Sequence, residues 1–342
     1  MSLSARSERA REARLRERER AREGGLPDAG EWPARAAAGP SPRRGRAGGP
    51  QSGGPRDPRR PSRWPLWAAA GSLVLALLLV IVIIGRRGSG GAGGATRPRA
   101  VVNVVVPEGL TRAQIAAIAR RDRLSGSYLA ASTRQPLLDP VAYGAPRGTP
   151  HLEGFLYPAT YQLYAGGSAT TLVADQLEAF REHFGPAQLA AARSLGITPY
   201  QLLIVASMIE REAGIARDRP LIAAVIYNRL HRGMPLGIDA TLRYALGDFT
   251  RPLTEAQLAT PSPYNTRLHR GLPPTPISNP GAEAIEAATH PAHAGYLYYV
   301  AGADGCGESV FSDTYAAFLE NVAAYRRALS ANGGHVPACH RR

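Results

Sequence analysis

One segment restricts the fold of this chain more than any other: residues 65–85, PLWAAAGSLVLALLLVIVIIG, contain no charged side chain. At about 1.5 Å per residue, a helix of this length spans a bilayer hydrocarbon core of roughly 30 Å. A cleaved signal peptide has a shorter apolar region, lies nearer the N-terminus and ends at a small-residue cleavage site, and this segment has none of these features. The sequence therefore predicts a single transmembrane helix over residues 65–85.

Arginines beside the predicted helix set its orientation. Four Arg residues lie in the ten positions before it, and two directly follow it. The positive-inside rule therefore places the N-terminus in the cytoplasm and everything after the helix outside, as in a single-pass type II protein of the cell membrane. Residues 1–64, rich in Arg, Pro and Gly, are predicted to be a disordered cytoplasmic tail, and residues 86–99 a Gly-rich linker.

The net charge of +14 is concentrated before residue 100. Residues 1–64 hold 16 Arg against 8 acidic residues, and residues 65–99 hold four Arg and no acidic residue. About +2 therefore remains on residues 100–342. Because nucleic-acid binding depends on clustered cationic charge, the sequence predicts no nucleic-acid partner for the folded region.

The rest of the sequence predicts an α+β fold. The β-branched run Val101–Val106 indicates a strand, and Thr111 is placed to cap a helix over the residues that follow. These two elements form a small strand–helix unit within residues 100–150. A mostly helical domain is predicted over residues 151–330, followed by a tail over residues 331–342.

The larger domain carries clear helix signals. Thr198 and Pro199 supply the N-cap and first residue of a helix that ends at Gly214. A second helix is predicted from Pro220 to Gly233. Two further helices are predicted to begin at Asn279–Pro280 and at Ser312 or Asp313, and the segments 296–300 and 309–311, on either side of a Gly-rich loop, predict a β-hairpin.

Two cysteines, Cys306 and Cys339, lie in the region predicted to face outward. Disulfides persist outside the cytoplasm, so this pair is able to form one. The bond requires a Cβ geometry that sequence does not report. A disulfide and two unpaired, partly buried thiols therefore both stay open.

The motifs of several enzyme classes are absent from the sequence. It has no HExxH, CxxC, Walker phosphate loop or GxSxG, and no GxGxxG before a helix. The eight His residues are scattered along the chain, which favours ordinary surface histidines over a zinc site. We therefore predict no metal and no cofactor.

Two glutamates lie at the end of the apolar helix that begins at Pro199. At 100° per residue, Glu212 falls beside Val205 on one flank and Glu210 beside Leu203 on the other, about 160° apart. They cannot both face one cleft. A single carboxyl among apolar side chains has a raised pKa and acts as a general acid near neutral pH. The alternative is that both glutamates pair with arginines at the helix end.

Proline and small polar residues dominate two later segments, 260–266 and 271–280. Because proline fixes the backbone, these segments can hold Tyr and Asn side chains rigidly without regular hydrogen bonding. A groove lined with hydroxyl, amide and aromatic groups suits a sugar or peptide ligand. A Pro-rich surface connection is the alternative.

Several separated motifs follow one another in the second half of the chain. LEGFLYPATY occupies residues 152–161, and ASMIERE occupies residues 206–212. Further motifs are VIYNRL at 225–230, MPL at 234–236, SPYNT at 262–266, GLPP at 271–274 and ISNPG at 277–281. In the same order they resemble the motifs of the endolytic murein transglycosylases of the MltG, or YceG-like, type, over about residues 100–330.

The resemblance implies a fold and a reaction. The strand–helix unit of residues 100–150 is expected to be LysM-like, and residues 151–330 are expected to form the catalytic domain. The expected activity is that of a lyase that cleaves the β-1,4 bond between N-acetylmuramic acid and N-acetylglucosamine within nascent peptidoglycan strands. It leaves a 1,6-anhydromuramic end and so terminates glycan elongation. The expected partners are glycan strands and the peptidoglycan synthesis machinery.

The resemblance also assigns residues. The second glutamate of the ExE pair, Glu212, is the expected catalytic acid, which protonates the glycosidic oxygen and then accepts a proton from the muramic C6 hydroxyl as that oxygen attacks C1. The residues expected to contact substrate are Glu210, Glu153, Asp239, Tyr264 and Asn265.

Two other functions stay open. Residues 236–241 read LGIDAT where the family has LQ[ST]DPT, and the loss of two polar side chains favours a noncatalytic peptidoglycan-binding scaffold. Retention of Glu212 favours an enzyme. A hydrolase that gives reducing ends would instead need a second carboxylate, such as Glu153 or Asp239, about 6.5–9.5 Å from Glu212.

Overall fold

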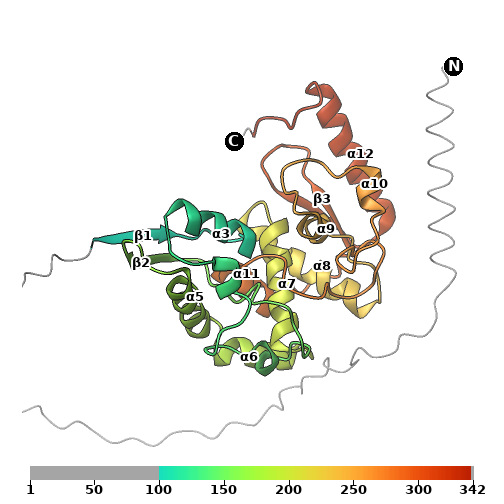
Figure 1. Cartoon of the computed structure of the whole chain (residues 1–342). Helices are drawn as coiled ribbons and strands as arrows, with labels where there is room; N and C mark the ends of the chain where they lie inside the picture. The colour runs from blue at the N-terminus through green and yellow to red at the C-terminus, as the bar shows by residue number, and fades with distance from the viewer. Residues whose placement is uncertain (1–99, 340–342) are drawn as a thin grey trace, which may run out of the picture. The chain divides into compact units, whose positions relative to one another are not determined.

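A computed structural model of the chain describes residues 100–339 (Figure 1). The predicted cytoplasmic tail, transmembrane helix and linker, which make up residues 1–99, lie outside the described residues. Between residues 100 and 339, no single helix has both the length and the apolar composition to cross a membrane; the helices at 186–194 and 199–212, bent by 95° relative to each other, meet that test only as a pair.

The described chain begins with a two-stranded antiparallel sheet. β1 (Val101–Val105) pairs with β2 (Thr160–Tyr164). Thr111 caps α3 (Arg112–Arg121) as predicted: its side chain accepts a hydrogen bond from the N–H of Gln114, whose side chain accepts one from the N–H of Thr111. The connection from α3 to β2 also contains α4 (Tyr128–Ala131) and the short 3-10 helix η1 (Pro140–Tyr143).

This sheet crosses the domain boundary predicted at residue 150. β2 comes from the region assigned to the larger domain, and Val104 of β1 and Tyr161 of β2 belong to the same buried core as Leu152 and Phe155. A lone strand leaves its backbone donors and acceptors unpaired, so the strand–helix unit is incomplete without β2. The structure therefore pairs this unit with residues up to Tyr164, and the domain boundary at residue 150 stays a prediction.

Helix α7 (Pro199–Glu212) runs through the middle of the described region (Figure 1). Thr198 caps it and a proline occupies its first position, as predicted. All residues from 202 to 209 are buried. A helix that is apolar on all sides needs partners on all sides, and α11 (Ala282–Thr289) and α8 (Arg219–His231) pack against it. The last turn of α7 carries both glutamates of the ExE pair.

Some helix starts differ from the prediction. α11 begins at Ala282 rather than at residues 279–280, because the backbone N–H and C=O of Asn279 are paired with Leu110 and Gly109 instead of with a helix. α12 (Tyr315–Ala331) begins after its N-cap, Thr314. The elements that carried no strong sequence signal are α5 (Ala169–His183), α6 (Pro186–Ser194), α9 (Asp239–Leu246), α10 (Glu255–Leu258) and the 3-10 helix η2 (Ala216–Asp218).

The C-terminal part of the described chain contains the predicted hairpin. β3 (Tyr298–Ala301) pairs with β4 (Ser309–Ser312), and α12 packs against this hairpin. Cys306 and Cys339 form a disulfide with their Cα atoms 4.6 Å apart, which resolves the alternative that the sequence left open. The hairpin is thereby tied to the segment after α12. The described region is thus a mixed α+β fold, mostly helical with two small sheets.

Candidate active site around Glu212

Glu212 is the last residue of α7, and its side chain is half-buried. The hydroxyl of Tyr299, on β3, donates a hydrogen bond to Oε2 of Glu212 at 2.8 Å. Helix α7 therefore delivers this carboxyl to the hairpin end of the fold. Glu210 faces a different element, as the helical spacing predicts.

Burial is the largest influence on Glu212 and raises the pKa of its carboxyl. The hydroxyl of Tyr299 and the N–H of Ala240 stabilise the carboxylate and act in the opposite direction on this pKa, while the nearby negative charge of Asp239 raises it further. The guanidinium of Arg267 also lowers the pKa of Glu212, by a smaller amount. The net direction is upward, which favours the protonated form needed for a general acid.

Asp239, a predicted substrate contact, is the first residue of α9. It forms an ion pair with Arg267, whose Nε lies 3.0 Å from Oδ1 of Asp239. Both side chains are more than 40% exposed, so this ion pair beside Glu212 is in contact with solvent. The structure thus brings Asp239 and Glu212 together, with the N-terminal end of α9 directed at the Glu212 carboxyl.

Asn265, a predicted substrate contact, uses its side-chain amide within its own loop. Its side chain is fully buried, and Nδ2 donates to the carbonyl oxygens of Leu258 and Thr260, while Oδ1 accepts from the N–H of Arg267. These bonds occupy both amide hydrogens and the amide oxygen within one loop. Asn265 thus holds the loop that presents Arg267 to Asp239, because a buried amide must satisfy its hydrogen bonds locally, and its contact with substrate stays a prediction.

Glu210, another predicted substrate contact, is bonded to the start of α11. Its Oε2 accepts a hydrogen bond from the N–H of Gly281 at 3.1 Å, at the start of α11. Gly281 is the N-cap of α11 and has no side chain to cap the helix. The carboxylate of Glu210 therefore pairs the N–H of the N-cap residue itself and supplies the negative charge that a helix N-terminus favours. This position assigns Glu210 to joining α7 and α11.

Helix α8 fixes the two segments that carry the neighbours of Glu212. Arg229 donates from Nε to the carbonyl oxygen of Leu297 at 2.6 Å and from Nη1 to that of Leu236 at 2.7 Å. Leu297 directly precedes β3, and Leu236 lies shortly before α9. Asn228 holds the same connection through the carbonyl oxygens of residues 294 and 296. The VIYNRL motif thus positions the site from behind it.

Glu153 is buried, with 2% of its surface exposed, in a second polar cluster. Its carboxylate accepts hydrogen bonds from the N–H of Arg112 at 3.0 and 3.2 Å, from Nδ2 of Asn279 at 2.8 Å and from the hydroxyl of Tyr244 at 3.1 Å. Burial nevertheless raises the pKa of Glu153 to about 7. This residue therefore connects α3, α9 and the segment before α11, and the structure does not place it opposite Glu212.

The motifs of the sequence meet around Asn279 and Ser207. Oδ1 of Asn279 accepts from the N–H groups of Gly154 and Leu156, and the hydroxyl of Ser207 accepts from the N–H of Ile277. Gly154 has φ +89°, and a Cβ there would lie 2.5 Å from Pro276. Only glycine fits this position without strain, which explains the LEG triplet in physical terms.

A cavity of about 820 Å³ opens beside Glu153, between α3, the C-terminal end of α9 and the loop residues 247–250 and 262–264. Tyr264, a predicted substrate contact, lines it together with Tyr244; their ring centroids are 5.2 Å apart. The hydroxyl of Tyr264 lies 2.8 Å from that of Thr275. Tyr264 therefore belongs to the Glu153 cluster at the C-terminal end of α9, whereas Glu212 and Asp239 lie at its N-terminal end.

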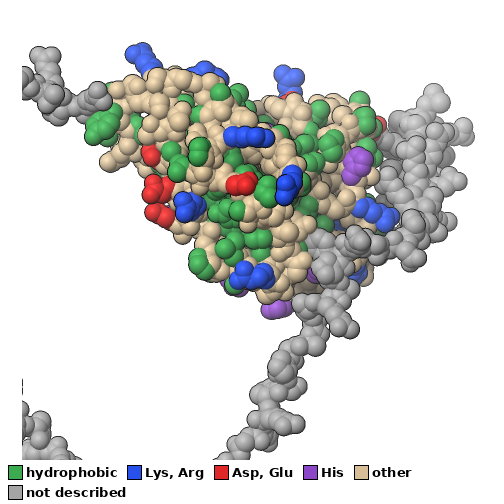
Figure 2. Space-filling model, turned by 60° about the horizontal axis from the view of Figure 1, so that its bottom comes forward, with side chains coloured by type: hydrophobic (Ala, Val, Ile, Leu, Met, Phe, Trp, Pro, Cys, Tyr) green, Lys and Arg blue, Asp and Glu red, His purple; other side chains and the backbone are tan. Residues whose placement is uncertain are grey.

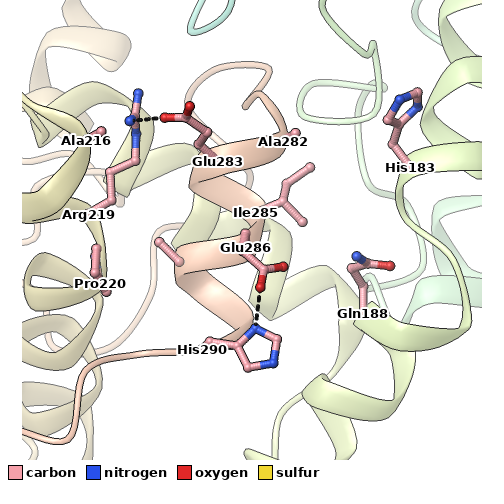
Figure 3. Close-up of a pocket in the computed structure, with 11 residues that line it drawn as sticks. His183, Gln188, Ala216, Arg219, Pro220, Ala282, Glu283, Ile285, Glu286 and His290 are labelled. Atoms are coloured by element: carbon pink, nitrogen blue, oxygen red, sulfur yellow. Dashed lines mark hydrogen bonds and ion pairs between the residues drawn. The ribbon is translucent and has the colours of Figure 1, made fainter.

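A second cavity, of about 660 Å³, lies along α11 and contains none of the predicted site residues. Figure 3 shows α11 between Arg219 on one side and His183 and Gln188 on the other. Glu283 pairs with Arg219, and Glu286 with His290. Both glutamates that line this cavity are thus paired with a neighbouring side chain.

The charges of the described surface do not point to a metal or a nucleic acid. Within residues 100–339, no group of three or more His, Cys, Asp and Glu side chains is arranged to hold a metal ion. On the face shown in Figure 2, the Arg side chains are scattered among apolar and neutral ones rather than gathered into one patch.

Three residues that complete the Glu212 site are not among those predicted from the sequence: Tyr299, Arg267 and Arg229. Arg229 lies within the VIYNRL motif, which is the sequence signal that could have identified it. Tyr299 and Arg267 reach Glu212 only through the folding of distant segments, and their local sequence does not distinguish them from neighbouring Tyr and Arg residues.

Known proteins resemble this chain in sequence and fold. Residues 92–324 match the YceG-like family. The endolytic murein transglycosylase of Bacillus subtilis strain 168 is 37% identical over 163 residues, which are 48% of this chain and 45% of that protein. The protein of the same name from Streptococcus pneumoniae serotype 2 is 35% identical over 155 residues, 44% of this chain and 28% of that protein. The matches thus span less than half of these curated relatives.

A solved structure agrees with the sequence matches. The 2.6 Å crystal structure of a YceG-like protein from Listeria monocytogenes has a TM-score of 0.57 and 32% sequence identity to this chain, and the alignment covers 70% of this chain and 80% of that one. The family match and this structure agree with the motif order and with the mixed α+β architecture. The chain belongs to the YceG-like family.

Proposed function

We propose that this protein is an endolytic peptidoglycan transglycosylase with Glu212 as its catalytic acid. One observation carries the proposal: the half-buried carboxyl at the end of the core helix has a raised pKa, and the hydroxyl of Tyr299 holds its Oε2. The names of the Bacillus and Streptococcus relatives support the same reaction class.

The proposed reaction needs one acid that later serves as a base. Glu212 donates its proton to the oxygen of the β-1,4 bond as the bond from that oxygen to C1 of the muramic residue breaks. The C6 hydroxyl of the same residue attacks C1 and forms the 1,6-anhydro bond, and its proton passes to the Glu212 carboxylate. The products are an N-acetylglucosamine end and a 1,6-anhydromuramic end, with Glu212 again protonated.

A single carboxyl suffices because the nucleophile belongs to the substrate. Intramolecular attack can have an effective molarity on the order of 10⁵ M or more, so it outcompetes water without a second acid. The other carboxylates support this assignment: Glu210 caps α11 and Glu153 is held by three donor groups. Asp239 is the one predicted carboxylate close to Glu212, and its partner is Arg267.

The sequence extends the proposal to the setting of the enzyme. The uncharged segment 65–85 would anchor the chain in the cell membrane, with residues 100–339 outside. The unit of β1, α3, α4 and β2 would be the LysM-like element that contacts glycan. In this position the enzyme would cut nascent strands near the peptidoglycan synthesis machinery and so end their elongation.

The test is mass spectrometry of products from uncrosslinked peptidoglycan treated with the full-length chain or its Glu212→Gln variant. Glutamine keeps the shape of the side chain and cannot donate a carboxyl proton. We expect anhydro ends from the wild type alone. Reducing ends would indicate a hydrolase with Asp239 as the second carboxylate. Absence of cleavage by both proteins would favour the noncatalytic scaffold.

A further inference from the structure

We propose that Tyr299 is a positioning residue that fixes which oxygen of Glu212 carries the transferable proton. Its hydroxyl donates to Oε2 of Glu212 at 2.8 Å. In a protonated carboxyl the carbonyl oxygen is the better acceptor, so a hydrogen bond accepted at Oε2 favours the hydrogen on Oε1. Oε1 is then the oxygen that donates to the glycosidic bond. This inference rests on the proposed function of Glu212.

The position of Tyr299 is rigid enough for this role. Its ring packs against Phe311, the residue opposite it on β4, with centroids 5.8 Å apart. Arg229 holds the backbone two residues earlier, at Leu297. Burial, together with the negative charge of Glu212, raises the pKa of Tyr299 well above its ordinary value, so the hydroxyl keeps its proton and remains a donor.

The neighbouring tyrosine provides a matched comparison within the same strand. Tyr298 stacks on Phe318 of α12, with centroids 5.4 Å apart, and lies under the guanidinium of Arg229. Adjacent residues of a strand point to opposite faces. Tyr298 and Tyr299 therefore share backbone, ring size and hydroxyl, and only the Tyr299 hydroxyl is bonded to Glu212.

Other charged groups face Glu212 from each element around it. They are Arg211 on α7, Asp239 at the start of α9 and Arg267 on the loop after α10. Asp239 and Arg267 are paired, so their charges largely offset each other at a distance. Arg211 donates to the carbonyl oxygen of Gly109 and lies over the ring of Phe249. Tyr299 differs from all three because it bonds one named oxygen of the carboxyl.

Removal of the hydroxyl has a predictable sign. The Tyr299 hydrogen bond stabilises the carboxylate and lowers the pKa of Glu212, so its loss raises that pKa. The alkaline limb of the pH–rate profile, where the acid loses its proton, then moves up by about one pH unit. We expect kcat to fall about tenfold, because the Glu212 carboxylate that forms when the proton is transferred is less stabilised. We expect KM to stay unchanged, since the hydroxyl is bonded to Glu212.

The experiment measures the pH–rate profiles of the full-length wild type, Tyr299→Phe and the control Tyr298→Phe on uncrosslinked glycan strands. Infrared difference spectra against Glu212→Gln isolate the carboxyl band of Glu212 and give its titration without reference to turnover. We expect the upward shift in both readouts for Tyr299→Phe and in neither for Tyr298→Phe. An unchanged Glu212 titration in a folded Tyr299→Phe protein would overturn the proposal.

A second variant covers the case in which Tyr299→Phe loses its fold. Replacement of Tyr299 with 3-fluorotyrosine keeps the ring and strengthens the hydroxyl as a donor, so the Glu212 titration and the alkaline limb should move to lower pH. A shift in the other direction would contradict the role. If Glu212→Gln still cleaves glycan, the proposed function fails, while the infrared titration continues to test the contact between Tyr299 and Glu212.

Discussion

Asn279 and Glu153, 126 positions apart in the sequence, are joined by a 2.8 Å hydrogen bond from Nδ2 to Oε1. The same Nδ2 donates to the carbonyl oxygen of Leu110. The Oδ1 atom accepts from the N–H groups of Gly154 and Leu156, in the LEGFLYPATY motif, which is called the LEG segment below. The side chain of Asn279 is fully buried. One amide therefore fastens the segment before α3, the LEG segment and the segment before α11 to one another.

Replacement of Asn279 with alanine should destabilise the fold strongly. It leaves the buried N–H groups of Gly154 and Leu156 without a partner, and each such group costs about 1–3 kcal/mol. We expect a loss of at least about 3 kcal/mol in the free energy of unfolding, measured by chemical denaturation followed by circular dichroism. Asn321→Ala, which removes a single hydrogen bond to Ser312, is the control and should cost about 1 kcal/mol. Equal effects would show that Asn279 does not fasten these segments.

The sequence predicts the framework of this site better than its chemistry. The caps of α3 and α7 depend on residues three positions apart, so local pattern suffices to place them. The divergence of Glu210 and Glu212 follows from helical geometry alone. The partners of Glu212 do not follow in this way, because Tyr299 is 87 positions away and reaches Glu212 only when the hairpin docks on the end of α7.

Residue type misleads where a polar side chain serves the fold. Asn265 stands in a Pro-rich segment that suits a ligand groove, yet its amide is used entirely by its own loop. A sequence shows which hydrogen-bonding groups a residue has and not which of them the fold consumes. The same reasoning applies to Glu210, whose carboxylate accepts a hydrogen bond from the N–H of Gly281, the N-cap residue of α11.

Glu153 should make the stability of the protein depend on pH. Burial raises its pKa from 4.5 to about 7, so the folded state prefers the protonated carboxyl. Its contribution to the free energy of unfolding is fully present below pH 4.5 and is lost as the pH rises to about 7. We expect Glu153→Gln to remove this part of the pH dependence in thermal melts between pH 4.5 and 8. Glu320→Gln, at an exposed position on α12, should leave the dependence as in the wild type, and an identical profile for Glu153→Gln would contradict the prediction.

Arg229→Lys should reduce turnover more than stability. A guanidinium reaches the carbonyl oxygens of Leu297 and Leu236 at the same time, and a single ammonium on a flexible stem cannot match both directions. The segments that carry Tyr299 and Asp239 then lose their common support. We expect kcat to fall about tenfold or more, because small displacements of catalytic groups have large effects on rate. Arg232→Lys, at an exposed position just after α8, is the control, and equal rates for the two variants would contradict the positioning role of Arg229.

Asp239→Asn should shift the pH–rate profile in the direction opposite to that expected for Tyr299→Phe. The negative charge of Asp239 raises the pKa of Glu212, so its neutralisation lowers this pKa, and the acid loses its proton at lower pH. The alkaline limb of the profile then moves down. The melting temperature should change little, since the ion pair with Arg267 is exposed. Asp313→Asn, outside the site on an exposed position, controls for the loss of one charge.

The products of Asp239→Asn separate the transglycosylase from the hydrolase. In a transglycosylase the C6 hydroxyl of the substrate is the nucleophile, so the variant still makes anhydro ends, with a shifted pH optimum. In a hydrolase Asp239 would activate water from the opposite side of the sugar, and its neutralisation would abolish cleavage. Mass spectrometry of the ends formed by wild type and Asp239→Asn at matched pH therefore decides which role the Asp239 carboxylate has. Because Arg267 already engages that carboxylate, we expect anhydro ends from both proteins.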